Sequence, residues 1–137
     1  DVLEDERLVE RSAELGEWLG GKLRALADKH PSVGDVRGMG LFWTLELVKD
    51  RATKEPLRKA TEKYVRTIVK DVSEYLFREK NVYVPSDKFG IWVVPPLVVT
   101  RDELELVVDA IDDALHLADA HIAGSRKPKS RAPATRT

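Results

Sequence analysis

The spacing of apolar residues switches repeatedly between the period of a helix and that of a strand, and this constrains the fold more than any other feature. Over residues 5–30 leucines recur three, four and seven positions apart, which predicts an amphipathic helix ended by His30-Pro31. Residues 33–36 and 41–48 are predicted to form short strands, the second with large apolar residues at alternate positions. We expect residues 37–40, Arg-Gly-Met-Gly, to interrupt them.

The second half of the chain alternates in the same way. A polar loop over 49–56 precedes a predicted helix over 57–80, whose apolar residues again have helical spacing. Short strands are expected at 81–84 and 91–94, and Pro95-Pro96 closes the second of them.

The last helix has the clearest start signal. Thr100 is placed to cap the free N–H groups of the first turn, while Glu103 reaches back to the N–H of Thr100, as in a capping box. We expect this helix to end at Gly124. The full order predicts an α+β fold, with a small, mostly antiparallel sheet of about four short strands covered by three helices.

The charge distribution separates a folded domain, residues 1–124, from a basic tail, residues 125–137. The tail holds five of the 23 basic residues and none of the 24 acidic ones, which leaves the rest of the chain with a net charge of −6. It has no large apolar residue and is therefore expected to be disordered. The tail alone suits a nucleic-acid partner, but the acidic folded part argues against one.

Composition excludes several classes of protein. Cysteine is absent, so disulfides and thiolate chemistry are excluded. The sequence shows no signal-peptide pattern and no apolar run long enough to cross a bilayer, so we expect a cytoplasmic protein without a membrane partner. The chain opens at Asp1 within a charged helical pattern, which we interpret as the sign of a fragment.

The residues alone give little reason to expect catalysis. His116 and His121 are five apart, hence on different helix faces, and we expect these two and His30 to lie on the surface or at a helix end and to form no metal site. Asp112-Asp113 is interpreted as a solvated pair on a helix surface. These observations leave open a stand-alone, non-catalytic ligand-binding or regulatory module.

Two segments resemble the class-III (ornithine/omega-type) aminotransferases. They are HPSVGDVRGMGLFWTLELVKDRATKEPL, residues 30–57, and NVYVPSDKFGIWVVPPLVVTRDELELVVDAIDDAL, residues 81–115. The motif residues of the resemblance are Gly38 and Gly40 in Val-Arg-Gly-x-Gly-Leu, and Pro95 and Pro96 in Pro-Pro-Leu-x-x-Thr. The resemblance implies that the chain is the C-terminal small domain of a fold-type-I enzyme.

For the parent enzyme, the resemblance implies transfer of an amino group from an amine or amino-acid donor to a keto acid. The large domain of that enzyme holds pyridoxal 5′-phosphate (PLP) on its lysine, and the full-length protein is a homodimer. No residue of this chain matches the family's lysine motif, so no catalytic residue is nominated. The chain alone is expected to be inactive and not to bind PLP.

Three residues are implied to contact substrate. Trp92 stands where many relatives carry a carboxylate-binding arginine, and Pro85 stands where others carry a mobile arginine. Lys88 is the only cation of that loop and offers a point-charge substitute. Trp92 either lines an apolar pocket or packs against the second helix. Arg37, the motif arginine, either pairs with a nearby acid or lies close to the substrate channel.

Overall fold

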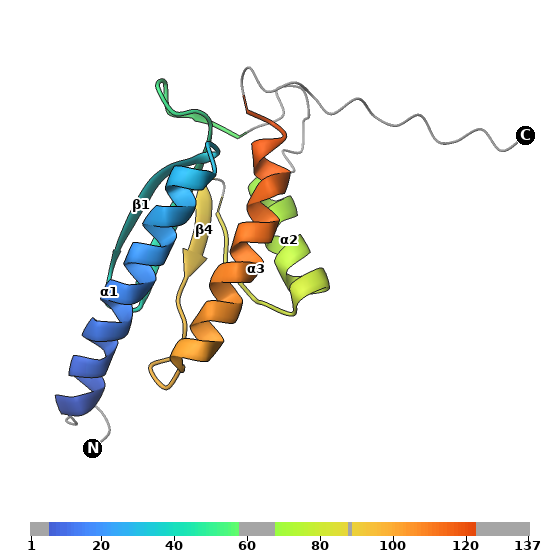
Figure 1. Ribbon diagram of the computed structural model, residues 1–137. Helices are drawn as coiled ribbons and strands as arrows, with labels where there is room; N and C mark the ends of the chain where they lie inside the picture. The colour runs from blue at the N-terminus through green and yellow to red at the C-terminus, as the bar shows by residue number, and fades with distance from the viewer. Residues whose placement is uncertain (1–5, 58–67, 88, 123–137) are drawn as a thin grey trace, which may run out of the picture.

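Over the described part of the chain, three helices accompany a four-stranded antiparallel sheet. This arrangement confirms the predicted α+β class (Figure 1). The computed structural model describes residues 6–57, 68–87 and 89–122. The elements are α1 (Glu6–Lys29), β1 (Val33–Met39), β2 (Phe42–Asp50), β3 (Glu55–Pro56), α2 (Ile68–Lys80), β4 (Gly90–Val93) and α3 (Arg101–Asp119). The tail and most of the N-terminal half of the predicted second helix lie outside the described residues.

Strand β2 is central and pairs with all three other strands. β1 lies against it up to the pairs Gly38–Trp43 and Met39–Phe42, so residues 37–39 belong to a strand, and the expected interruption there was wrong. Strand pairing uses backbone groups, which Gly38 supplies as well as any residue. The chain reverses only at Gly40, where φ is +54°. β4 pairs with residues 43–46 of β2, and β3 pairs with Val48 and Asp50.

Two predicted segments differ from the structure. Strand β3 falls within the expected polar loop, and the strand predicted at 81–84 is absent from the described chain. Asn81 has a φ of +54°, and the N–H of Val82 donates to the carbonyl of Leu76, which closes the end of α2. The Oγ of Ser73 then donates to the carbonyl of Val84 over 2.7 Å. Residues 81–84 are therefore held by α2 instead of by the sheet.

The core lies between the sheet and the helices. On β2, Trp43, Leu45 and Leu47 are buried, while Phe42 is half exposed on the opposite face. Figure 1 shows α1 running alongside β1, and α3 lying between α1 and α2. The largest fully buried side chains come from every helix and from β1, β2 and β4, among them Leu19, Leu23, Leu45, Leu76, Ile91, Leu104, Ile111 and Leu115.

Helix α3 begins as predicted but ends earlier. The Oγ1 of Thr100 accepts the N–H of Glu103 at 3.2 Å, and Glu103 Oε1 accepts the Thr100 hydroxyl at 3.0 Å. The carboxylate therefore reaches the hydroxyl of Thr100. In a capping box it would instead accept the backbone N–H of Thr100, as the sequence predicts. The helix ends at Asp119, with Ala120 as its C-cap, and Gly124 lies outside the described residues.

A polar cluster around the buried His30 joins the end of α1 to α3. We define the His30 cluster as His30, Asp112, His116 and Asp119. The His30 ring is 1% exposed, with Nδ1 2.5 Å from Asp119 Oδ2 and Nε2 2.6 Å from Asp112 Oδ1. Each ring nitrogen therefore faces a carboxylate oxygen within hydrogen-bond distance, so the ring is held from both sides. The helix-end position expected for His30 is correct, but a surface position is not.

The two adjacent aspartates both form ion pairs. Asp112 contacts Lys29 as well as His30. The hydrogen bond from Lys29 lowers the pKa of the Asp112 carboxyl most, and the hydrogen bond with His30 lowers it further. Asp113 pairs with Lys80 of α2 at 2.5 Å, and that hydrogen bond lowers the pKa of the Asp113 carboxyl. Asp112 and Asp113 were expected to be merely solvated charges. They instead link α3 to α1 and to α2 through ion pairs.

Candidate substrate-binding site

Arg37, Thr44 and Trp92 form a row across three strands. Arg37 is the register partner of Thr44 in β1 and β2, and Thr44 is the register partner of Trp92 in β2 and β4. Side chains of directly opposed residues in an antiparallel ladder point to the same face. The structure therefore brings together two of the three residues implied to contact substrate, Arg37 and Trp92. The third, Lys88, lies outside the described residues.

This row lies on the face of the sheet turned away from the helices. We call it the open face and define it by Arg37, Phe42, Thr44, Glu46 and Trp92. Its members are exposed or half-buried, whereas the intervening residues of β2 are buried. The period of two along each strand thus assigns one set of side chains to the core and the other to the open face.

Trp92 contributes an apolar surface. It is 37% exposed, while its neighbours Ile91 and Val93 belong to the helix-side core. Trp92 therefore points away from α2, and its ring centroid lies 6.3 Å from that of Phe42. The two rings together form an aromatic surface on the open face.

A pocket of about 240 Å³ opens on the same face. It is lined by Arg37, Thr44, Glu46, Asp87, Phe89 and Gly90. The Oδ1 of Asp87 accepts the N–H groups of Phe89 at 2.7 Å and of Gly90 at 2.9 Å, which fixes the turn at the pocket wall. A Cβ at Gly90 would lie 2.1 Å from the carbonyl oxygen of Leu45, so the close approach of β4 to β2 at this point requires glycine.

Arg37 both lines the pocket and forms ion pairs. Its guanidinium lies 3.3 Å from Asp35 and 3.3 Å from Glu46, and its side chain is 65% exposed. The two interpretations offered by the sequence, pairing with an acid and proximity to a ligand site, are therefore compatible. An exposed ion pair of this kind is weak and leaves the guanidinium available to an anionic ligand.

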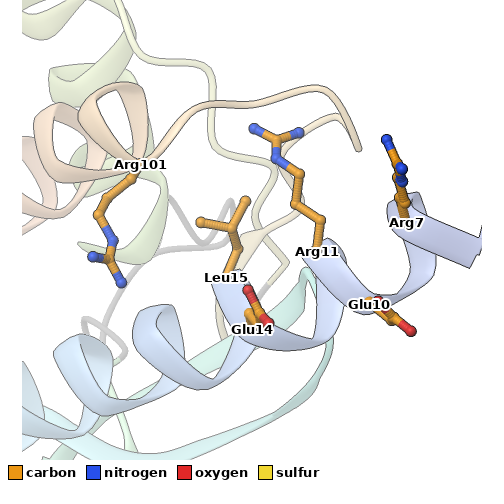
Figure 2. Close-up of a pocket in the computed structure, with 6 residues that line it drawn as sticks. All are labelled: Arg7, Glu10, Arg11, Glu14, Leu15 and Arg101. Carbon is orange, nitrogen blue, oxygen red and sulfur yellow. The ribbon is translucent and has the colours of Figure 1, made fainter.

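The Pro95-Pro96 segment is held by a residue that the sequence did not indicate. The guanidinium of Arg11 in α1 donates to the carbonyls of Leu97, at 3.3 Å, and Val99, at 2.6 Å. Figure 2 shows Arg11 in a second pocket, of about 520 Å³, with Arg7, Glu10, Glu14, Leu15 and Arg101. The bonds span 86 and 88 residues of sequence, so no local pattern could have revealed them.

The pocket of the open face does not fit the phosphate of PLP. Among the described residues that line it are two carboxylates, Glu46 and Asp87, beside the guanidinium of Arg37. A phosphate ester carries up to two negative charges, so these carboxylates would repel it more strongly than a singly charged group. The described residues that line this pocket therefore do not suit the phosphate group of PLP.

The comparisons with known proteins establish the family. The family model for class-III aminotransferases matches residues 1–115, and the chain belongs to that family. It is 39% identical over 116 residues to the hypotaurine/taurine–pyruvate aminotransferase of Paracoccus denitrificans, covering 83% of this chain and 25% of that protein. The taurine–pyruvate aminotransferase of Rhodobacter capsulatus is 38% identical over 116 residues, which cover 83% of this chain and 25% of that protein.

A solved structure agrees with the sequence relatives. The omega-transaminase of Pseudomonas jessenii, crystallised in complex with PMP, superposes with a TM-score of 0.72 at 30% identity, over 85% of this chain and 24% of that one. The chain thus spans about a quarter of the length of the relatives it matches. Among the helices of the described residues, none is both long and apolar enough to span a bilayer.

Proposed function

We propose that this chain is the C-terminal small domain of a cytoplasmic, PLP-dependent aminotransferase that transfers an amino group from an amine or amino-acid donor to a keto acid. The observation that carries the proposal is the row of Arg37, Thr44 and Trp92 on the open face, in a chain belonging to the class-III family. The open face is turned to a large domain, which is this chain's partner in a homodimeric enzyme. PLP, bound to that large domain, supplies the electron sink for amino transfer.

The residues of the open face suit a donor with charged groups at both ends and a short apolar body. Glu46 and Asp87 attract a cationic amine, and Arg37 offers a guanidinium to an anionic end. Trp92 and Phe42 present an aromatic surface to the body of the donor. Trp92 replaces an arginine fork, so the site favours amines, omega-amino acids or sulfonates over α-amino carboxylates. The names of two relatives, both taurine–pyruvate aminotransferases, support a sulfonate donor.

Lys88 is part of the same proposal. It follows Asp87 and precedes Phe89, both of which line the pocket. A lysine in this loop offers a point charge to the anionic end of the donor, whereas other family members carry a mobile arginine at the position of Pro85. Arg37 and Lys88 would then divide the recognition of that end between a strand and a loop.

The chain alone is proposed to be inactive, and the alternative is a stand-alone module that binds a small ligand without catalysis. The coding frame upstream of Asp1 separates the two. A frame that continues into a large domain with a PLP lysine supports the aminotransferase. Its full-length product should then transfer the amino group of taurine to pyruvate, giving sulfoacetaldehyde and alanine, while the 137-residue chain should not. A start codon next to Asp1, with the chain binding a small amine by itself, would favour the binding module.

A further inference from the structure

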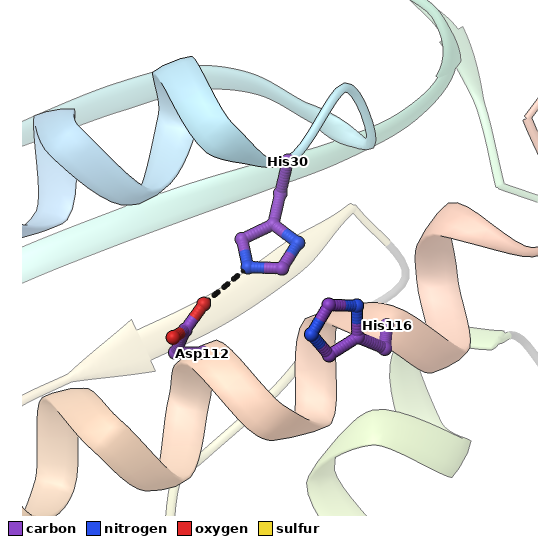
Figure 3. A group of neighbouring side chains, drawn as sticks. All are labelled: His30, Asp112 and His116. Carbon is purple, nitrogen blue, oxygen red and sulfur yellow. Dashed lines mark hydrogen bonds and ion pairs between the residues drawn. The ribbon is translucent and has the colours of Figure 1, made fainter.

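The geometry of the His30 cluster points to a divalent metal site, and we propose that it binds Zn²⁺ through His30, Asp112 and His116. Figure 3 shows the three side chains converging from α3 and the end of α1. One potential ligand atom of each lies within 4.8 Å of those of the other two. We had expected no metal site from the sequence, and the proposal departs from that expectation. It is independent of the proposed function.

The position of Asp119 determines which ring nitrogens face the metal. Its Oδ2 lies 2.5 Å from Nδ1 of His30 and 3.9 Å from Nδ1 of His116, so it faces the same nitrogen of both rings. The Nε2 atoms are then the metal ligands. Histidines that bind zinc usually place their other nitrogen against a carboxylate, which orients the ring and raises its basicity. Asp119 is a positioning residue of this kind.

Each carboxylate of the cluster is also held by its second oxygen. Lys29 contacts Oδ2 of Asp112 at 2.8 Å, which leaves Oδ1 directed toward His30 Nε2. The hydroxyl of Ser32 donates to Oδ1 of Asp119 at 2.6 Å, which leaves Oδ2 directed toward the histidines. The ligand oxygen and the positioning oxygen are therefore oriented before any ion arrives.

The separation of the two imidazole rings is compatible with a shared zinc ion. Their centroids lie 4.9 Å apart with an interplanar angle of 72°. Zn–N bonds of about 2.0 Å at a tetrahedral angle place two ring centroids about 5 Å apart. Asp112 and His116 are four residues apart, on one face of α3, which is the helical spacing suited to sharing an ion.

Binding requires the three ligand atoms, which now lie up to 4.8 Å apart, to reach the spacing of about 3.3 Å found around a tetrahedral zinc. Nε2 of His30 and Oδ1 of Asp112 are 2.6 Å apart, and ligand atoms of a tetrahedral zinc are about 3.3 Å apart, so this pair opens by about 0.7 Å. The His116 side chain is 62% exposed and free to turn inward. The ion replaces the proton on His30 Nε2, which is released to solvent, and a water molecule completes the four ligands. The bound ion links the end of α1 to α3.

The test is a titration of the 137-residue chain with Zn²⁺ by calorimetry, in the presence of a competing chelator of known affinity. We expect one equivalent to bind, with affinity reduced at least about tenfold by His116→Ala or by Asp119→Asn. His121→Ala is the matched control, because it removes an exposed histidine five residues away and should leave the affinity unchanged. Co²⁺ bound in place of Zn²⁺ should give the intense visible absorption of a four-coordinate ion.

Three results would overturn the proposal. The first is the absence of saturable Zn²⁺ binding, and the second is an unchanged Zn²⁺ affinity in His116→Ala. The third is an equal loss of Zn²⁺ affinity in His116→Ala and His121→Ala. Circular dichroism of His116→Ala separates loss of a ligand from loss of the fold, and an exposed side chain should be removable without unfolding. Saturating Zn²⁺ should also raise the Tm of the chain by about 5 °C, and a fall in Tm would show that the ion prefers the unfolded chain.

Discussion

Gly20 of α1 lies directly against the indole of Trp43 in β2. A Cβ at Gly20 would come within 2.3 Å of Cη2 of Trp43, whereas a Cβ at the neighbouring Gly21 would have nothing within 4 Å. Helix α1 therefore packs against the sheet at Gly20, where the Trp43 ring fills the space that a side chain at residue 20 would occupy. The two adjacent glycines, which the sequence does not distinguish, have different physical roles.

This difference predicts opposite effects of two alanine substitutions. Gly20→Ala should destabilise the chain by about 1–3 kcal/mol, because the methyl group forces the buried indole to shift. Gly21→Ala should stabilise it by about 1 kcal/mol, because alanine is the better helix former. The free energy of unfolding in urea measures both. Equal effects would show that Gly20 does not rest on Trp43.

Substitution of Trp92 should change donor preference in the full-length enzyme. Trp92→Arg places a guanidinium on the open face and should raise kcat/KM for an α-amino carboxylate donor relative to taurine by about tenfold or more. Leu106→Arg, at an exposed position of α3, adds the same charge elsewhere and should leave the ratio unchanged. Steady-state kinetics with both donors gives the answer, and an unaltered ratio in Trp92→Arg would exclude a role for Trp92 in recognition.

Loss of the Arg11 guanidinium should loosen the segment after Pro96. Arg11→Met keeps much of the side-chain length but removes the donors to Leu97 and Val99, at a cost of about 1–3 kcal/mol. Amide exchange at Val99, whose N–H bonds to Pro96, should accelerate. Lys22→Met is the control, because it removes a charge from the same helix at a residue that contacts Trp18. The rate of amide exchange at Val99 should be unchanged in this variant.

The cap of α3 should depend on a hydroxyl. Thr100→Ala removes the acceptor for the N–H of Glu103 and should lower the free energy of unfolding by about 1 kcal/mol. Thr100→Ser retains that acceptor and should restore most of the stability. Chemical denaturation of the three proteins tests this, and an equally unstable serine variant would assign the effect to the methyl group.

The pairing of Asp113 with Lys80 predicts a pH dependence. The hydrogen bond from Lys80 lowers the pKa of the Asp113 carboxyl below its ordinary 3.8. A carboxyl with a lower pKa in the folded state contributes stability above its unfolded pKa and loses it as the pH falls through the folded pKa. Lys80→Ala should therefore make unfolding less sensitive to acid below about pH 4. In an Asp113→Asn background the same substitution should have no such effect.

Local patterns predicted much of the fold because they reflect local physics. The period of the leucines indicates α1, and Thr100 and Glu103 mark the start of α3. The alternation separates core from open face over residues 41–47, but it fails at Val48, which is buried beside the buried Leu47. Gly38 was misleading because a glycine weakens a strand without preventing its pairing. Asn81 was missed because its left-handed backbone ends α2 where an ordinary strand was expected.

The contacts that position the candidate sites join residues far apart in the sequence. His30 and Asp112 are 82 residues apart, and the spacing of Asp112 and His116 on one helix face is informative only once His30 lies beside them. For the open face, the resemblance identified Arg37 and Trp92 separately. Only the register through Thr44 shows that they lie in one row, on the two strands that flank β2.

The one-sided covering of the sheet has a consequence for how such a domain evolves. Over residues 42–47 of β2 and 91–93 of β4, residues that support the helices alternate with residues that face outward. Substitutions at Thr44 or Trp92 can therefore accumulate with little cost to folding, whereas those at Leu45 or Ile91 cannot. A library randomised at Thr44 and Trp92 should yield mostly folded proteins with varied ligand preference. Under the proposed function, the residues that determine stability and those that determine donor selectivity are therefore different residues of the same strands.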